Sequence, residues 1–160
     1  MTTSAITGRA IRNPILSGVY PDPSILRVGS DYFIATSTFE WYPGVRIHHS
    51  TNLVDWRPMG GALNERRLLD LTGTGDSNGV WAPSLSYHDG TFYLLYADVP
   101  TFEGGYWDPQ NHLVTGPTPT GPWTDPVALH GRGFDASLFH DEDGTTWMLS
   151  MVADWRPGRN

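Results

Sequence analysis

One pattern occurs three times along the chain and limits the folds that the chain can adopt. Each copy is a short run of β-forming residues, a turn that contains Gly, and a second such run. The copies lie at residues 24–36, 84–96 and 137–150. Short runs of this kind are typical of β-strands, and Gly in the connection supplies the positive φ that tight hairpins need. The sequence therefore predicts three β-hairpins, and helical periodicity is almost absent.

The three hairpins are copies of one unit. Ser24, Ser84 and Ser137 begin them at the same place and lie 60 and 53 residues apart. A second motif repeats in step with the first, because the Trp- and Pro-containing segments 55–58 and 122–126 each follow a hairpin and precede a short apolar strand. A repeat of this length, built of four short strands, is typical of β-propeller blades. An all-β sandwich with coincidental similarity is the alternative.

The number of units is too small for a closed propeller. Two units and the opening hairpin of a third fit into the 160 residues, whereas closed propellers have at least about four blades. Residues 154–160 follow a strand directly and add no closing element. We therefore expect a fragment of a longer protein, with residues 1–10 as a flexible leader segment and 11–160 as a truncated propeller domain.

The composition excludes several classes of function. A net charge of −7 argues against nucleic acid as a partner, and the absence of Lys and Cys excludes lysine-based chemistry, disulfides and thiolate metal sites. No apolar run approaches the ~20 residues of a membrane span. Residues 1–10 lack the basic start and apolar stretch of a secretory signal, which favours a cytoplasmic protein. Seven Trp and seven Tyr are suited to stacking on sugars, although packing alone could also explain them.

The starts of the hairpins carry the residues of greatest chemical interest. The innermost strand of each propeller blade starts near the central channel, so residues at those starts converge. They include Asp22, Trp81, Ala82, Phe134 and Asp135. Hydrolysis of a glycosidic bond needs two carboxyl groups on opposite sides of the anomeric carbon, about 6.5–9.5 Å apart in inverting enzymes. A plainer interpretation is that Asp22 caps a turn and Asp135 begins a strand, since Asp favours such positions.

The motifs around these residues resemble those of a known family. Residues 13–24, which read Asn-Pro-Ile-Leu-Ser-Gly-Val-Tyr-Pro-Asp-Pro-Ser, resemble the opening of glycoside hydrolase family 43, especially of its β-xylosidases. Residues 79–84 (Gly-Val-Trp-Ala-Pro-Ser) and 133–139 (Gly-Phe-Asp-Ala-Ser-Leu-Phe) are similar to later motifs of that family, in the same order. The likeness covers roughly residues 11–160. It implies a five-bladed propeller, of which this chain supplies the first two blades and part of the third.

The resemblance also implies a mechanism and the residues that carry it. It implies hydrolysis of xylosidic or arabinofuranosidic bonds with inversion, in which Asp22 is the general base that activates water. Asp135 matches the carboxylate that raises the pKa of the general acid and orients it. The acid is a Glu in a later blade of the family, and no Glu of this chain lies in that setting, so we expect residues 1–160 alone to be inactive. The glutamates present are Glu40, Glu65, Glu103 and Glu142.

The resemblance further implies a sugar pocket with aromatic walls. Trp81 and Phe39 match those walls, with Ala82 and Phe134 close by, and hydrophobic packing is the alternative role for each ring. His48-His49 lies on a strand whose residues alternate between its faces, so at most one of the two faces the pocket, and we expect no metal site there. The chemistry requires no cofactor. Any calcium held in the channel of the complete protein would depend largely on residues beyond this chain.

Two other functions stay open beside a glycosidase acting on xylo-oligosaccharides or arabinosyl substrates. A fructan-type hydrolase is another five-bladed enzyme with an early Asp-Pro motif. That group is retaining and begins with an Asn-Asp-Pro-Asn type of segment, which residues 21–24 do not match. A non-catalytic sugar-binding propeller is the alternative from another class. It would need no water-activating base, whereas this chain has an acid at two of its three hairpin starts.

Overall fold

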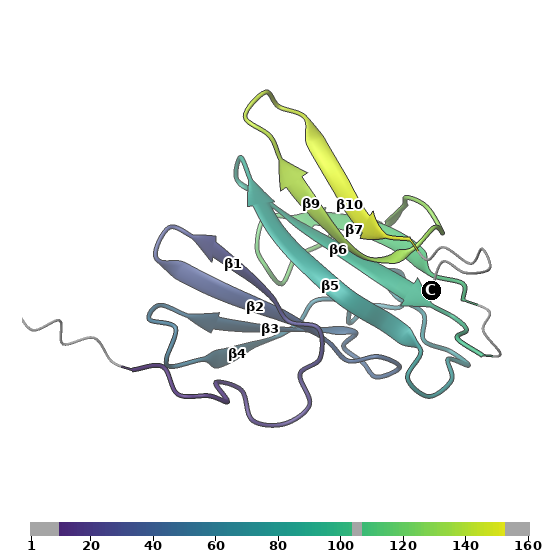
Figure 1. The fold of residues 1–160 in the computed structure, drawn as a ribbon, viewed down its shortest axis with the longest axis horizontal. Helices are drawn as coiled ribbons and strands as arrows, with labels where there is room; N and C mark the ends of the chain where they lie inside the picture. Colours follow the sequence, from purple (N-terminus) through teal and green to yellow (C-terminus); the bar gives the residue numbers. More distant parts are fainter. Residues whose placement is uncertain (1–9, 104–106, 153–160) are drawn as a thin grey trace, which may run out of the picture.

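The computed structural model describes residues 10–103 and 107–152, and every regular element in this part of the chain is a β-strand (Figure 1). The strands form three antiparallel sheets. Their bounds are β1 Ser24–Val28, β2 Asp31–Ser37, β3 Val45–Ser50, β4 Arg57–Gly61, β5 Gly79–His88, β6 Thr91–Val99, β7 Gln110–Gly116, β8 Val127–Ala128, β9 Phe134–His140 and β10 Thr146–Met151. The predicted leader segment falls almost wholly on residues 1–9, which lie outside the described residues, as do residues 154–160.

Each sheet follows the order of the chain. The first sheet has the order β1-β2-β3-β4, the second has the order β5-β6-β7-β8, and β9 pairs with β10 in the third. The all-β class, the three hairpins and two copies of the four-stranded unit are therefore confirmed. Figure 1 shows the sheets side by side, from the purple first sheet through the teal second to the yellow third, and β5 contacts both β1 and β9. The first strands of the three sheets are thus neighbours.

The hairpin turns follow from their residue types. In the second sheet, Asp89 and Gly90 join β5 to β6 with φ angles of 44° and 80°. A two-residue turn with positive φ at both positions matches the right-handed twist of the flanking strands, and Asp-Gly is a favoured pair for it. The turn fixes the register at His88 opposite Thr91.

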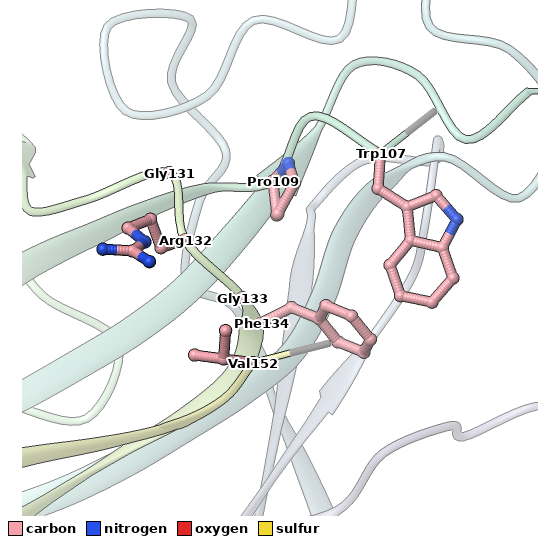
Figure 2. A pocket seen from close by; sticks show the side chains of 7 residues that line it. All are labelled: Trp107, Pro109, Gly131, Arg132, Gly133, Phe134 and Val152. Carbon is pink, nitrogen blue, oxygen red and sulfur yellow. The ribbon is translucent and has the colours of Figure 1, made fainter. Parts of the chain in front are cut away.

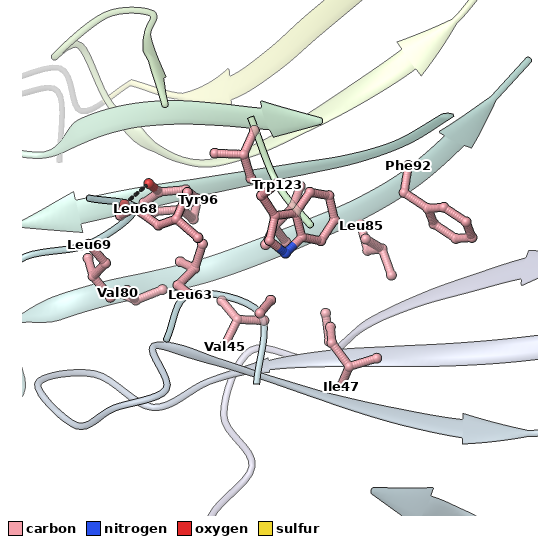
Figure 3. Close-up of a cluster of buried hydrophobic side chains, with 14 of the residues drawn as sticks. Val45, Ile47, Leu63, Leu68, Leu69, Val80, Leu85, Phe92, Tyr96 and Trp123 are labelled. Atoms are coloured by element: carbon pink, nitrogen blue, oxygen red, sulfur yellow. Dashed lines mark hydrogen bonds between the residues drawn. The ribbon is translucent and has the colours of Figure 1, made fainter. Parts of the chain in front are cut away.

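The main core lies between the first two sheets (Figure 3). Val45 and Ile47 of β3 and Leu94 of β6 belong to this core, and all three side chains are fully buried. Trp123, from the second repeated motif, is buried in the same core with 4% of its surface exposed. The hydroxyl of Tyr96 donates a hydrogen bond of 2.6 Å to the carbonyl of Leu68, so this buried phenol is satisfied. Burial of each large apolar side chain contributes about 1.5–3 kcal/mol, which holds the two sheets together.

A smaller core joins the second sheet to the third. Ala97, Val99 and Phe134 are buried there, and the half-buried rings of Trp81 and Trp107 pack against them. This core lies at the end of the sheets where β5 and β9 begin, and it contains two of the residues that the sequence marked. No helix in residues 10–103 and 107–152 is long and apolar enough to cross a membrane.

Candidate active site

The same backbone irregularity occurs where the first strand of each sheet begins. Two residues of that strand stand opposite one residue of its partner, which is a β-bulge. In the first sheet the bulge is closed by the amide of Ser37, which donates to the carbonyl of Pro21 at 3.1 Å. The bulged pairs are 22–23 opposite 36, 82–83 opposite 96 and 135–136 opposite 150.

The first residue of every bulge has a left-handed backbone. The φ angles are 51° at Asp22, 36° at Ala82 and 54° at Asp135. This conformation costs a residue with a side chain about 1–2 kcal/mol, and it is uncommon outside Gly, Asn and Asp. Its recurrence at one position of three sheets shows that the fold builds it repeatedly, and bulges of this kind redirect side chains beside active sites. The three predicted residues are structurally equivalent, as the repeat implied.

The negative charge of Asp22, in the first sheet, acts on the carboxyl group of Asp135 in the third. The pKa of Asp135 is raised above its ordinary value by partial burial and, second, by the negative charge of Asp22. Two residues far apart in the sequence therefore lie within electrostatic reach. A pair of carboxyl groups in which one holds its proton more tightly than usual is the electrostatic pattern of acid–base catalysis, although structural pairs also produce it.

The rings of Trp81 and Phe134 form one aromatic cluster between the second and third sheets. Their centroids lie 5.7 Å apart at an interplanar angle of 86°, and Trp107 approaches Phe134 to 4.9 Å. Phe134 has only 8% of its surface exposed, so much of its ring serves packing, whereas Trp81 is half-buried. Figure 2 shows the adjoining pocket of about 250 Å³, with the rings of Trp107 and Phe134 next to each other and Arg132 on the opposite side.

Phe39 lines a different pocket from Trp107 and Phe134. It follows β2 with a φ angle of 51°, and with Tyr20 and Trp41 it lines a second pocket of about 520 Å³ beside the first sheet. Its carbonyl accepts a hydrogen bond of 3.1 Å from the amide of Val80, the residue before Trp81. Phe39 and the residue before Trp81 are therefore joined through the backbone, whereas the ring of Trp81 lines neither of these two pockets. The roles of all six predicted site residues stay predictions.

The two adjacent histidines point to opposite faces of β3, as their strand spacing predicts. His48 is 4% exposed and meets the ring of Tyr20 edge-on, whereas Nε2 of His49 lies 2.6 Å from a carboxylate oxygen of Asp31. Within residues 10–103 and 107–152, no three His, Asp or Glu side chains are grouped so that they could hold a metal ion.

Sequence reasoning missed several polar residues beside the aromatic walls. Ser37 donates its hydroxyl hydrogen to the carbonyl of Val80, and the carboxylate of Glu40 accepts a hydrogen bond from the amide of Ser77. Trp107 was also missed. The motifs that mark the repeat do not include these residues; the one available clue was that Glu40 directly follows Phe39, which the resemblance assigned to the wall of the sugar pocket.

Comparison with known proteins places the chain among the glycoside hydrolases. The profile of Glycosyl hydrolases family 43 matches residues 11–160. The chain belongs to this family. It is 53% identical to xylosidase/arabinosidase 43B of Humicola insolens over 91% of this chain and 27% of that protein. It is 52% identical to a β-xylosidase of Bacillus subtilis over 94% of this chain and 28% of that protein.

Solved structures agree with the sequence relatives. The crystal structure of a xylan β-1,4-xylosidase from Bacillus halodurans superimposes with a TM-score of 0.91 at 56% identity, over 94% of this chain and 29% of that one. The chain therefore spans somewhat more than a quarter of the length of these relatives.

Proposed function

We propose that this chain is the N-terminal part of an inverting glycoside hydrolase that cleaves xylosidic bonds, with arabinofuranosides as a second substrate class. Relatives named for xylosidase and arabinosidase activity support these substrates, as does a non-reducing end α-L-arabinofuranosidase of Bacteroides ovatus at 41% identity. The longer protein that contains the chain is called the full-length protein below. We propose that it closes a five-bladed propeller, whose first two blades are the two four-stranded sheets described above.

The observation that carries the mechanism is the repeated left-handed bulge, which presents Asp22 and Asp135 from sheets that flank the second sheet. Asp22 is exposed and activates the attacking water as general base. Asp135 keeps the pKa of a general-acid Glu raised through like-charge repulsion, and that Glu lies beyond residue 160. Water is the nucleophile and carboxyl groups transfer the protons, so the reaction needs no cofactor.

Trp81 and Phe39 provide the aromatic walls of the sugar site, with Ala82 at the bulge of the second sheet. Ala82 has the smallest side chain of the three bulge residues, and its strand β5 contacts both β1 and β9. A sugar ring against an aromatic face is held by apolar contact, which leaves its hydroxyl groups for the polar residues.

The test compares the full-length protein with residues 1–160 on aryl xylosides and aryl arabinofuranosides. We expect turnover by the full-length protein and none by residues 1–160, because the leaving group needs a proton from an acid that this chain lacks. NMR of the first-formed sugar should show the inverted anomer. A retained anomer would favour the fructan-type mechanism, and sugar binding without turnover in the full-length protein would favour the non-catalytic alternative.

A further inference from the structure

We infer that Glu40 is a positioning residue, which holds the indole of Trp81 in place through the peptide of Ser77. The inference rests on the proposed function only in the role of Trp81 as a sugar wall. The contacts that carry it belong to the first sheet's loop and to the segment that leads into β5. They do not involve Asp22 or Asp135.

Two hydrogen bonds in series make the connection. The Oε2 atom of Glu40 accepts a hydrogen bond of 3.0 Å from the backbone amide of Ser77. The carbonyl of Ser77 in turn accepts a hydrogen bond of 2.9 Å from Nε1 of Trp81. The amide and the carbonyl of Ser77 are therefore both hydrogen-bonded. The carboxylate of Glu40 fixes Ser77, and the carbonyl of Ser77 orients the indole of Trp81. A hydrogen bond to an ionised carboxylate is stronger than one between neutral groups, which suits it to this task.

The backbone of the segment before β5 has features that require a stabilising contact. Ser77 has a φ angle of 64°, in the left-handed region, and it lies exposed in a turn region that also contains Gly73 and Gly75. A strained and exposed residue keeps its conformation only where its surroundings impose it. Asn78 fixes the next position, because its side-chain amide donates to the carbonyl of Pro100 at 3.3 Å. Glu40 is the side chain that fixes the peptide of Ser77 itself.

The arrangement couples the two aromatic walls. Glu40 directly follows Phe39, whose carbonyl accepts the amide hydrogen of Val80 at 3.1 Å. One short loop of the first sheet therefore fixes both the Phe39 wall and, through Ser77, the Trp81 wall. The carboxylate oxygen that bonds Ser77 is occupied within the protein, which fits a structural role for Glu40 and not the role of the missing acid.

The kinetic test uses the full-length protein and aryl xylosides. Glu40→Ala should raise KM roughly tenfold and change kcat less than about threefold, because the sugar wall loosens while the carboxylates stay in place. Glu40→Gln should restore most of the loss, since its amide oxygen accepts the same hydrogen bond. Glu142→Ala is the matched control, because Glu142 lies exposed in the β9–β10 turn and its carboxylate makes no hydrogen bond within the described residues.

A double-mutant cycle isolates the pathway through the indole. Phe has no N–H group to bond the carbonyl of Ser77, so Glu40→Ala should have little further effect on KM in a Trp81→Phe background. An undiminished effect in that background would overturn the inference, as would a Gln variant as impaired as the Ala variant or an unchanged KM in Glu40→Ala.

An activity-independent measurement separates this inference from the proposed function. In the NMR spectrum of the ¹⁵N-labelled full-length protein, the indole N–H signal of Trp81, assigned by its loss in Trp81→Phe, should move or broaden in Glu40→Ala but not in Glu142→Ala. If the wild-type protein hydrolyses no glycoside, the proposed function fails while this signal still tests the coupling. An indole signal that is the same in wild type and Glu40→Ala would refute the coupling whatever the activity.

Discussion

Replacement of Gly79 by Ala tests whether the first sheet's loop is rigidly fitted to the start of β5. Gly79 has a φ angle of 85°, and a Cβ atom added to it would lie 2.4 Å from the carbonyl oxygen of Phe39 and 2.8 Å from its carbonyl carbon. Both atoms belong to the backbone, so no side-chain rotation can relieve the clash. Either the loop that carries Phe39 or the start of β5 has to move.

The expected cost has two parts. The left-handed φ costs Ala about 1–2 kcal/mol at any such position. Displacement of a packed backbone adds about 1–3 kcal/mol, the usual range for overpacking. Gly90→Ala provides a matched control, because Gly90 has a φ angle of 80° and nothing lies within 4 Å of its added Cβ. It should show the first cost alone, so the difference between the two variants measures the close approach.

The assay is thermal unfolding of the full-length protein, with both variants compared at one scan rate. In a protein as long as the relatives, of which this chain covers little more than a quarter, 1 kcal/mol shifts the melting temperature by about 1 °C, so Gly79→Ala should melt about 1–3 °C below Gly90→Ala. It should also weaken binding of aryl xylosides, because the shift displaces Phe39. Equal melting temperatures for the two variants would refute the reasoning, since the loop would then yield without cost.

Three further predictions concern the carboxylates and one histidine. Asp22→Asn should lower turnover of the full-length enzyme by ~10²–10⁴-fold while sugar binding persists; a variant that keeps more than about a third of wild-type turnover would contradict its role as base. Asp135→Asn should move the basic limb of the pH–rate profile to lower pH, because the general acid loses a negative neighbour; a uniform rate loss with an unmoved limb would indicate positioning instead. The pKa of His140, whose ring stacks on that of His88 at 5.0 Å, is lowered by burial and then by His88. The unfolded chain therefore binds this proton more readily, so stability should be lost as the pH falls below about 6.5; His140→Gln should reduce that loss, as measured by melting temperature against pH.

The sequence sufficed for the elements whose signals are local. Alternating runs and Asp-Gly turns specify a hairpin within a dozen residues, which is why β5, β6 and their turn lie where the pattern predicted. The repeat also related the three hairpin starts to one another. Trp123 shows the same advantage, because its place in the second motif anticipated its position just before the last strand of a sheet.

The sequence did not show how the hairpin starts are shaped. Ala82 gives no local sign of a left-handed backbone, since Ala rarely adopts one, and only the sheet's hydrogen bonds impose it. The tie between Glu40 and Ser77 joins residues 37 positions apart through a backbone amide, which no residue type announces. The burial of each ring was equally undetermined, since no local signal shows that Phe134 has only 8% of its surface exposed.

The repeated bulge has a consequence for how such a protein can change. The backbone shape of the bulge comes from hydrogen bonds within each sheet. The sheet therefore determines the direction of the side chain at position 22, 82 or 135. The spacing between those side chains then depends on how neighbouring sheets stack and not on the surface loops. Loops can therefore lengthen or shorten while these three side chains keep their separation. The three equivalent bulge positions, two occupied by Asp and one by Ala, therefore keep their backbone shape whatever the loops between the sheets carry.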